Sequence, residues 1–188
     1  MGTGILICGL NGTGKSTLGK ALAEMLHFYF IDHEDLYFPE MGLDDRYASP
    51  HTREEAEKRL FSEIQVHENF IFASVKGDYG EAVYPFFSVY LQVPKEIRLQ
   101  RVENRSYQQF GNRMDSGGDL HDQEERFFQF VASRAENTVE EWLPCLNCPI
   151  IRIDGTKPIE ENVHLILEPI ERDKSASAVS RLGWGMRS

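Results

Sequence analysis

The most informative stretch of the chain lies near its amino end and reads Gly9-Leu10-Asn11-Gly12-Thr13-Gly14-Lys15-Ser16. It matches the pattern G-x-x-x-x-G-K-[ST], which is typical of loops that bind the phosphates of a nucleoside triphosphate. Glycine has no Cβ atom, so the backbone here can take unusual dihedral angles and approach phosphate oxygens closely. Backbone N–H groups then point at the phosphates, and the positive end of the following helix adds to the attraction.

The pattern also assigns a task to each polar side chain in and after the loop. We expect Lys15 to reach the β- and γ-phosphates of ATP, Ser16 to place its hydroxyl on Mg²⁺, and Thr17 to reach the α-phosphate. Further contacts to the phosphates are expected from Gly9, Asn11, Gly12, Thr13 and Gly14. The stretch lies between a short β-prone run and a helical pattern, which is the context that a phosphate loop requires.

Short apolar runs alternate with helical patterns along most of the chain. The runs that predict strands are 5–8, 28–31, 70–73, 87–93 and 149–153. The helical patterns are 15–26, the second half of 36–68, 94–105, 121–142 and 158–167. Such an alternation is typical of a parallel sheet covered by helices. We therefore predict one α/β domain over residues 1–170.

Three segments fall outside this regular alternation. Residues 36–68 are too many for a plain connection, and Thr52 with Glu55 forms a capping box that begins a helix there. Residues 106–120 are polar and contain glycines, which predicts a loop and a candidate mobile lid. Residues 171–188 are rich in Ser, Ala and Arg, and we predict a loosely ordered tail.

The composition limits the classes of partner. The 188 residues carry a formal net charge of −10, which argues against broad binding to nucleic acid or to an anionic membrane. No apolar run approaches the roughly 20 residues of a membrane span, and the amino end lacks the basic start and cleavage site of a signal peptide. We expect a cytoplasmic protein that acts on a small molecule; the sequence does not indicate its oligomeric state.

Three cysteines are present, and two of them form a single C-x-x-C, Cys145 to Cys148. An odd, low number of cysteines fits a reducing compartment. A structural zinc site needs four ligands, and Cys8 lies far along the chain from the pair. A redox pair normally opens a helix, whereas prolines flank this one ahead of a strand. We interpret the pair as structural.

Other motifs decide among the classes of phosphate-loop protein. A GTPase needs D-x-x-G after the third strand and a later N-K-x-D; the first pattern occurs at 115–118, after the fourth strand, and the second is absent. A motor or remodelling ATPase usually ends the third strand with an acid that supports Mg²⁺. The third strand here continues into Ala73-Ser74-Val75. The metal therefore needs another acid, and Asp32 at the end of the second strand is placed for it.

With these residues the chain resembles the nucleoside monophosphate kinase-like group of small kinases, which includes adenylate, cytidylate, thymidylate and shikimate kinases. The resemblance covers about residues 3–168 and is carried by the segments 9–16, 32–35, 89–105 and 153–161. It implies a three-layer P-loop NTPase fold, with a five-stranded parallel sheet in the order 2-3-1-4-5, helices on both faces and a helical lid. It also implies that ATP lies on the phosphate loop and the acceptor in a helical lobe built from residues 36–68.

The resemblance implies further site residues. Arg101 and Arg105 match positions at the lid base that contact ATP phosphates or stack on adenine. The turn that contains Thr156, Lys157 and Pro158 is similar to the segment that wraps the adenine. Spacing places Arg98 on the same helix face as Arg101 and Arg105, and Arg113 and Arg134 are further candidates. A solvated basic surface is the alternative for each of these arginines.

The acidic cluster after the second strand has two interpretations. Asp32 and Asp35 are either turn and N-cap residues, or Asp32 holds Mg²⁺ through water and Asp35 orients or deprotonates the acceptor hydroxyl. Lys76 and Asp78 follow the third strand, at the edge where open α/β sheets bind ligands. They are candidate contacts of the acceptor, and surface positions are the alternative.

The sequence leaves the acceptor open. It lacks the T-G-x-x-x-R signature of adenylate and cytidylate kinases and the glycine run of shikimate kinases. Three arginines in the lobe, Arg46, Arg53 and Arg59, are candidates for binding an anionic acceptor. We predict transfer of the γ-phosphoryl group of ATP to a small acceptor, with a nucleoside monophosphate slightly favoured over a hydroxyl metabolite. The alternative is an ATP-hydrolysing switch without a small-molecule acceptor.

Overall fold

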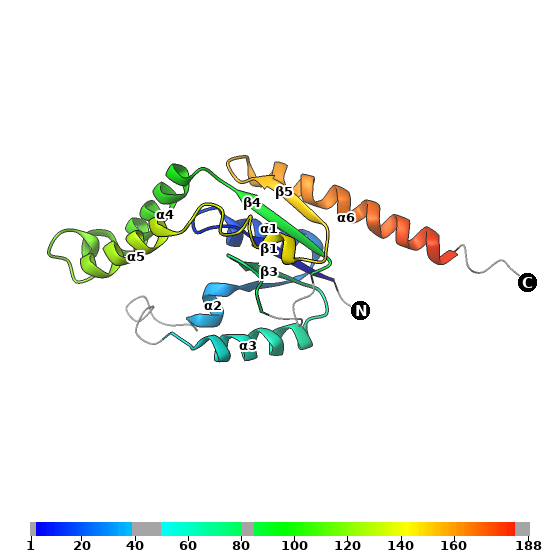
Figure 1. The fold of residues 1–188 in the computed structure, drawn as a ribbon, viewed down its shortest axis with the longest axis horizontal. Helices are drawn as coiled ribbons and strands as arrows, with labels where there is room; N and C mark the ends of the chain where they lie inside the picture. The colour runs from blue at the N-terminus through cyan, green and yellow to red at the C-terminus, as the bar shows by residue number, and fades with distance from the viewer. Residues whose placement is uncertain (1–2, 39–49, 80–84, 183–188) are drawn as a thin grey trace, which may run out of the picture.

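Five parallel strands form a single sheet at the centre of the molecule (Figure 1). The computed structural model describes residues 3–38, 50–79 and 85–182. The strands are β1 (Gly4–Cys8), β2 (Tyr29–Asp32), β3 (Phe70–Ser74), β4 (Phe87–Gln92) and β5 (Ile150–Asp154). Their order is β2-β3-β1-β4-β5, and every neighbouring pair is parallel. The predicted sheet and strand order are confirmed.

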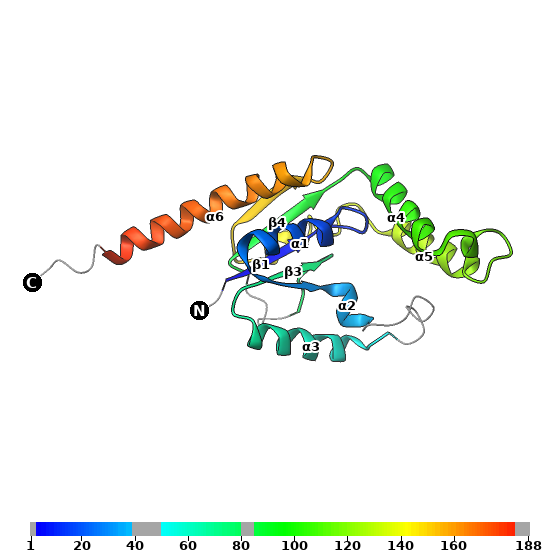
Figure 2. The same ribbon diagram turned by 180° about the vertical axis from the view of Figure 1, so that it is seen from behind.

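Helices cover both faces of the sheet. They are α1 (Lys15–Leu26), α2 (His33–Tyr37), α3 (Arg53–Val66), α4 (Lys95–Phe110), α5 (His121–Ser133) and α6 (Ile159–Leu182). One core joins the sheet to α1 and α6 through Leu18, Leu22 and Ile166. The other joins it to α2, α3 and the segment after α5 through Leu36, Leu60 and Val139. Figure 2 shows α1 in front of the sheet, on the side turned away in Figure 1.

The central strands β1 and β3 are almost entirely apolar because helices cover both faces of the sheet. All five residues of β1 and of β3 are buried, and alternate residues enter the two cores: Ile5 and Ile7 enter one, Leu6 and Cys8 the other. A continuous apolar strand of this kind is typical of parallel sheets. The register pairs Cys8 of β1 with Ser74 of β3 and with Tyr90 of β4. The carboxyl ends of these three strands therefore lie at the same edge of the sheet.

An arm made of α4 and α5 projects from the sheet (Figure 1). Its helices differ from the sequence prediction for the loop 106–120: α4 continues to Phe110, and a 3₁₀ turn follows at Gly111–Met114. The reason is that Val102, Ser106 and Phe110 continue one buried face at four-residue spacing. The helix ends at Gly111, whose φ of 54° suits glycine.

The helix expected over 121–142 is also shorter than predicted. Helix α5 ends at Ser133, and Arg134 takes an extended conformation. Turns and a 3₁₀ helix at Leu143–Cys145 follow. Packing explains the break, because Val139 and Leu143 leave the arm and enter the core on the sheet. Val139, which suggested a longer helix, therefore packs on the sheet instead.

The predicted lobe contains α3, and the predicted tail continues α6. The capping box at the start of α3 is confirmed: Thr52 Oγ1 accepts from the Glu55 N–H, and Glu55 Oε2 accepts from the Thr52 N–H at 2.8 Å. Helix α6 runs to Leu182 and contains Pro169. Residues 171–182 of the predicted tail are therefore part of α6, and residues 183–188 lie outside the described residues. Within the described ranges, no helix has both the length and the apolar character to cross a membrane.

Candidate nucleotide and acceptor site

The predicted phosphate loop connects β1 to α1 at the carboxyl edge of the sheet. Gly14 precedes the first residue of α1 with φ of 95°, and Gly12 has φ of 80°. Both angles lie in the left-handed region, which side chains other than glycine rarely adopt. A Cβ atom on Gly12 would also lie 2.3 Å from the backbone oxygen of Arg98. The loop therefore needs glycine at both positions, and the first helix presents its N-terminal N–H groups beside it.

Lys15 lies at the centre of the site. Its Nζ donates to the Leu10 carbonyl at 3.1 Å, so the side chain folds back over the loop. Burial lowers the pKa of Lys15 to about 8, while the negative charges of Glu34 and Asp32 act in the opposite direction. The positive charge of Arg105 adds to the lowering of the pKa. Two acids and a second cation therefore surround the lysine.

The acidic residues that follow β2 interact with different parts of the molecule. Asp32 is the N-cap of α2, and its Oδ1 accepts from the Glu34 N–H at 3.1 Å. Glu34 Oε1 lies 3.9 Å from Arg105 Nη2. Asp35 is exposed. Burial and Glu63 raise the pKa of Tyr29, and the charge of Asp35 adds to this rise. The structure thus brings Asp32 and Glu34 toward Lys15, and the sequence missed Glu34.

A cavity of about 210 Å³ extends from the phosphate loop to the turn between β5 and α6. It brings together five residues predicted to bind nucleotide, namely Thr13, Gly14, Thr17, Arg101 and Lys157. Arg101 Nη1 donates to the Gly155 carbonyl at 3.1 Å, which ties α4 to this turn. The cavity has an arginine and the apolar Ile159 in its lining, which suits a flat aromatic base.

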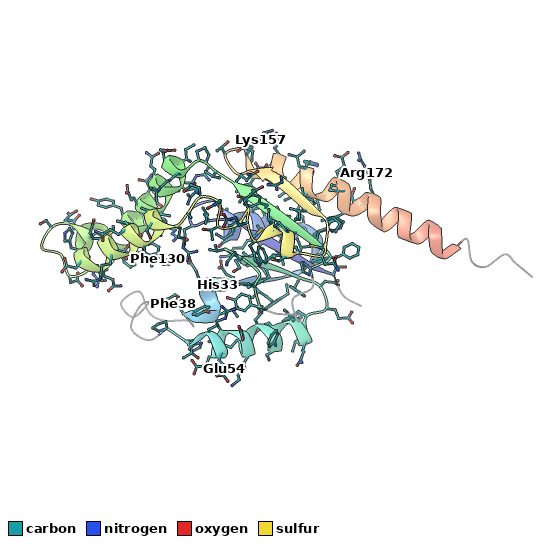
Figure 3. All side chains as sticks on the ribbon, viewed as in Figure 1. His33, Phe38, Glu54, Phe130, Lys157 and Arg172 are labelled. Carbon is teal, nitrogen blue, oxygen red and sulfur yellow. The ribbon has the colours of Figure 1, made fainter. Side chains whose placement is uncertain are left out.

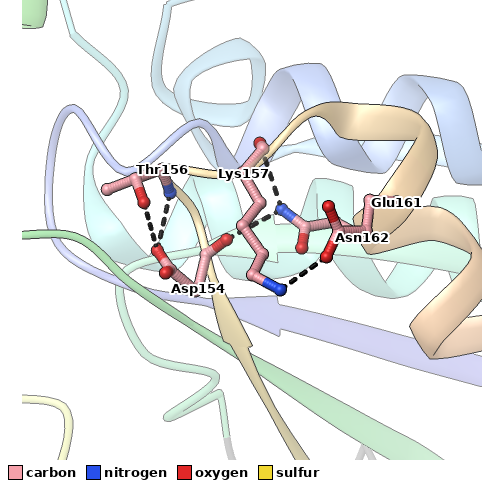
Figure 4. A network of polar contacts seen from close by, with 5 residues as sticks. All are labelled: Asp154, Thr156, Lys157, Glu161 and Asn162. Atoms are coloured by element: carbon pink, nitrogen blue, oxygen red, sulfur yellow. Dashed lines mark hydrogen bonds and ion pairs between the residues drawn. The ribbon is translucent and has the colours of Figure 1, made fainter.

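Hydrogen bonds fix the shape of the β5–α6 turn (Figure 4). Asp154 Oδ1 accepts from the Thr156 N–H at 2.9 Å and from its hydroxyl at 2.7 Å. Asn162 Nδ2 donates to the Asp154 carbonyl at 2.9 Å, and its Oδ1 is buried without a partner among the described residues. Lys157 pairs with Glu161. Figure 3 shows Lys157 on the opposite side of the molecule from Glu54 of α3.

Thr156 and Pro158 are not in the lining of the 210 Å³ cavity. Thr156 lines a second cavity of about 560 Å³, together with Gln92 at the end of β4, Arg152 of β5 and Arg98 of α4. The Pro158 carbonyl accepts from the Asn162 N–H at 3.2 Å in the first turn of α6. Nucleotide contacts of Thr156 and Pro158 stay predictions.

Arg98 does not belong to a solvated surface. It is 1% exposed, and its guanidinium donates to the Asn11 carbonyl at 3.1 Å and to Glu136 Oε1 at 2.7 Å. The sequence pattern placed it on one face with Arg101 and Arg105, but these two are exposed and contact Gly155 and Glu34 instead. The surface alternative for Arg98 is wrong because the phosphate loop packs directly on the first turns of α4.

Arg134 lies at the end of α5, and its surroundings differ from those of Arg113. The Arg113 guanidinium pairs with Asp119 at 2.7 Å within the arm. The Arg134 guanidinium lies 4.7 Å from the centre of the Phe130 ring, and its buried Nε has no partner among the described residues. Burial lowers the pKa of His33, which follows Asp32, and the positive charge of Arg134 adds to this lowering. Figure 3 labels Phe130 on the arm and His33 on α2.

The remaining lobe candidates already have partners. Arg53 pairs with Glu57 and donates to the Asp78 carbonyl at 2.7 Å, while Arg59 Nη1 lies 3.0 Å from His51 Nδ1. Lys76 Nζ is 3.6 Å from Asp78 Oδ2, just after β3. Arg46 lies outside the described residues. Acceptor contacts by Lys76 and Asp78 stay predictions.

The cysteines fit the structural interpretation. Burial raises the pKa of the Cys8 thiol to about 12, and its Sγ lies 3.5 Å from the Val89 carbonyl. Cys148 Sγ lies 3.3 Å from Ser88 Oγ, and Cys145 is exposed; all three are free. Among the described residues, no three His, Cys, Asp or Glu side chains gather in a way that could hold a metal.

The residues around the loop nevertheless fit a magnesium nucleotide. Mg²⁺ in phosphate sites is held by one or two protein oxygens together with substrate phosphates and waters. Ser16 supplies a hydroxyl in the first turn of α1, and Asp32 supplies a carboxylate that acts on Lys15. These two residues remain the candidate metal contacts, and the glycine cradle with Lys15 is the candidate triphosphate site.

Comparison with known proteins gives a family match and distant relatives. A family model described as AAA domain matches residues 5–129. A Bacillus subtilis (strain 168) protein named Uncharacterized protein YqaC is 28% identical over 176 residues, covering 87% of this chain and 95% of that protein. The bifunctional shikimate kinase/3-dehydroquinate synthase of Thermotoga maritima is 30% identical over 112 residues, which cover 54% of this chain but 23% of that protein.

Several solved structures share the fold. A gluconokinase from Sinorhizobium meliloti 1021 has a TM-score of 0.58 at 17% identity, and the match covers 95% of this chain and 97% of the gluconokinase chain. A deoxyadenosine kinase from M. mycoides with bound dATP also scores 0.58, at 13% identity and coverages of 90% and 100%. Shikimate kinase from Aquifex aeolicus scores 0.50 at 19% identity, with coverages of 92% and 98%. These likenesses confirm the predicted P-loop kinase fold.

Proposed function

We propose that this chain, which belongs to the AAA domain family, is an ATP-dependent kinase acting on a small acceptor. One observation carries the proposal: Lys15 of the phosphate loop, Glu34 of α2 and Arg105 of α4 meet at one edge of the sheet. Two cations beside a phosphate loop suit a moving phosphoryl group, and an acid beside them suits activation of an acceptor.

On the donor side, the chain's own residues would bind and orient ATP. The loop glycines and the start of α1 would hold the phosphates, and the cavity between Arg101 and Ile159 would hold the base. Lys15 and Arg105 would neutralise charge that builds up on the phosphate oxygens during transfer. Mg²⁺, held by the phosphates with Ser16 and Asp32, would supply further neutralisation of that charge.

On the acceptor side, we propose Glu34 rather than Asp35 as the residue that orients and deprotonates a hydroxyl. Glu34 acts on Lys15 and contacts Arg105, whereas Asp35 acts on Tyr29. A hydroxyl must lose a proton when it attacks, so a carboxylate beside it assists the reaction. The phosphate of a nucleoside monophosphate is already ionised near pH 7. A base at this position therefore favours a hydroxyl metabolite over the nucleotide that the sequence slightly favoured.

Arg134 supports an acceptor that also carries an anionic group. Its guanidinium is partly buried, has no carboxylate partner among the described residues, and acts on His33 near the end of β2. A buried charge is costly unless an opposite charge or hydrogen bonds compensate it. The lobe arginines Arg53 and Arg59 have partners within the protein, so they give less support to a nucleotide acceptor.

An acceptor screen tests the proposal. ATP consumption would be measured with sugar acids, cyclic hydroxy acids, neutral sugars, nucleosides and nucleoside monophosphates, each beside Lys15→Ala. We expect a hydroxy acid to stimulate turnover at least tenfold and Lys15→Ala to abolish it. We also expect Arg134→Met to raise the KM for that acceptor at least tenfold, which corresponds to about 1.4 kcal/mol of acceptor binding. The KM for ATP should change less than twofold.

Other outcomes decide between alternatives. Strongest stimulation by a nucleoside monophosphate would restore the acceptor that the sequence favoured. Hydrolysis of ATP that no acceptor accelerates would support a switch module instead of a kinase. Equal activity in Lys15→Ala would overturn the assignment of the phosphate loop.

A further inference from the structure

Arg98 connects the phosphate loop to the segment that follows α5. The residue is 1% exposed, lies in the first turn of α4, and donates to the Asn11 carbonyl at 3.1 Å and to Glu136 Oε1 at 2.7 Å. Its backbone oxygen is also the atom that a Cβ on Gly12 would meet at 2.3 Å. Side chain and backbone of one residue therefore contact the same peptide of the loop.

The contact with Asn11 fixes the orientation of a peptide plane. A trans peptide is planar, so its C=O and N–H point in opposite directions. Because the Asn11 carbonyl points at the Arg98 guanidinium, the Gly12 N–H points away from Arg98. A flip of this peptide would remove the acceptor from Arg98 and leave a buried charge with one partner fewer, which is unfavourable.

Orientation of this N–H matters because a phosphate loop binds through converging backbone N–H groups. Glycine moves easily between backbone conformations, so a loop with glycine at 12 and 14 does not hold its N–H groups in place by itself. An outside group that fixes one peptide reduces the ordering that the ligand must otherwise impose. Arg98 is the group in that position.

We propose that Arg98 is a positioning residue, which holds the Asn11–Gly12 peptide with its N–H directed at the phosphates of the nucleotide. The inference rests on the proposed function, because it takes ATP as the ligand of the loop. Glu136 completes the arrangement by holding the second amino group of Arg98. Glu136 follows Arg134 by two residues, so the same bridge also fixes the start of the segment that leaves the arm.

Arg152 provides a matched control. It pairs with Glu140 at 2.7 Å, and like Arg98 it joins the segment after α5 to the rest of the fold and lines the 560 Å³ cavity. Among the described residues, its guanidinium makes no hydrogen bond or ion pair with the phosphate loop, and its other contact is with the ring of Tyr90, whose centre lies 5.4 Å away. Loss of Arg152 therefore removes a bridge to the same segment, although a more exposed one, without touching the Asn11–Gly12 peptide.

The test compares Arg98→Met with Arg152→Met, using MgATP as the probe in calorimetry and spectra of protein labelled with ¹⁵N-glycine. We expect Arg98→Met to weaken MgATP binding at least tenfold and Arg152→Met less than twofold. In wild type and Arg152→Met, MgATP should shift the Gly12 amide proton downfield, as in a new hydrogen bond; in Arg98→Met this shift should be at most half as large. Arg98→Lys keeps the charge with a single amino group, and we expect a loss of at least threefold.

The outcomes separate this inference from the proposed function. Binding of MgATP by Arg98→Met within twofold of wild type, with the full Gly12 shift, would overturn the positioning role alone. Equal losses in Arg98→Met and Arg152→Met would also overturn it, because both would then report a general weakening of the fold. If Arg98→Met does not fold, Arg98→Lys decides by the same two measurements. Wild-type protein that binds no MgATP at millimolar concentration would overturn the proposed function and this inference together.

Discussion

Arg105 Nη2 lies 3.9 Å from Glu34 Oε1, and this contact joins α4 to α2 beside Lys15. Both side chains are about half exposed, so the pair itself contributes little to stability. The pair matters because each side chain can leave the other to contact a ligand. When phosphates occupy the loop, we expect Arg105 to turn to their oxygens, which leaves the Glu34 carboxylate for the acceptor hydroxyl.

The first prediction separates Glu34 from Asp35. Removal of a general base typically slows catalysis by about 10²–10⁴-fold, so we expect Glu34→Gln to lower kcat at least 100-fold with the acceptor found in the screen. Asp35→Asn should lower kcat less than threefold, because Glu34 is the acid that contacts Arg105 and acts on Lys15. Steady-state kinetics of the two variants checks this. A larger loss in Asp35→Asn would restore the role that the sequence assigned to it.

The second prediction concerns pH. Burial lowers the Lys15 pKa to about 8 in the free protein, and phosphate oxygens should raise this pKa because they favour the charged amine. Above about pH 8 the protein must therefore take up a proton when it binds ATP, and the affinity should fall by up to about tenfold per pH unit. Calorimetry near pH 9 in buffers of different ionisation enthalpy measures the uptake. Release of a proton, or none exchanged, would contradict the assigned state of Lys15.

The third prediction separates the two arginines at the base of the arm. Arg101 lines the small cavity beside Gly155, whereas Arg105 reaches Glu34. We expect Arg101→Met to weaken binding of ATP and of ADP equally, by about five- to tenfold, with kcat within threefold of wild type. Arg105→Met should instead lower kcat at least tenfold. Binding titrations and single-turnover rates check both. The reverse pattern would exchange the roles of the two residues.

The sheet and the phosphate loop follow from local signals in the sequence. A short apolar run, a glycine-rich turn and a helical pattern stand next to one another from Ile5 to Leu26, so each part limits the others. The strand order was available only through the family resemblance. The structure then confirmed it.

The features that the sequence missed depend on contacts between distant segments. Arg98 and Asn11 are 87 positions apart, so helical spacing could not show that Arg98 is buried. Glu34 stands beside two aspartates, and only the position of α4 singles it out through Arg105. The end of α5 was misplaced because the spacing of Val139 from the other apolar residues fits a helix equally well, but Val139 packs on the sheet.

The last prediction concerns the turn that borders the small cavity. Asn162 is 3% exposed and donates through Nδ2 to the Asp154 carbonyl at 2.9 Å, which holds the turn that carries Gly155 and Lys157. In Asn162→Leu that carbonyl keeps only the Lys157 N–H, at 3.3 Å, as a donor, and the lost hydrogen bond costs about 1 kcal/mol. We expect a lower free energy of unfolding and at least fivefold weaker ATP binding, because Gly155 also accepts from Arg101.

His164 provides the control for that turn, because it lies two residues further along α6 and is exposed. His164→Leu should change neither the free energy of unfolding by more than about 0.5 kcal/mol nor the ATP affinity by more than twofold. Denaturant unfolding and ATP titration of both variants measure the two effects separately. If Asn162→Leu lost stability but bound ATP as tightly as wild type, the turn would support the fold without shaping the base cavity. The adenine site would then have to lie elsewhere along the edge formed by β4 and β5.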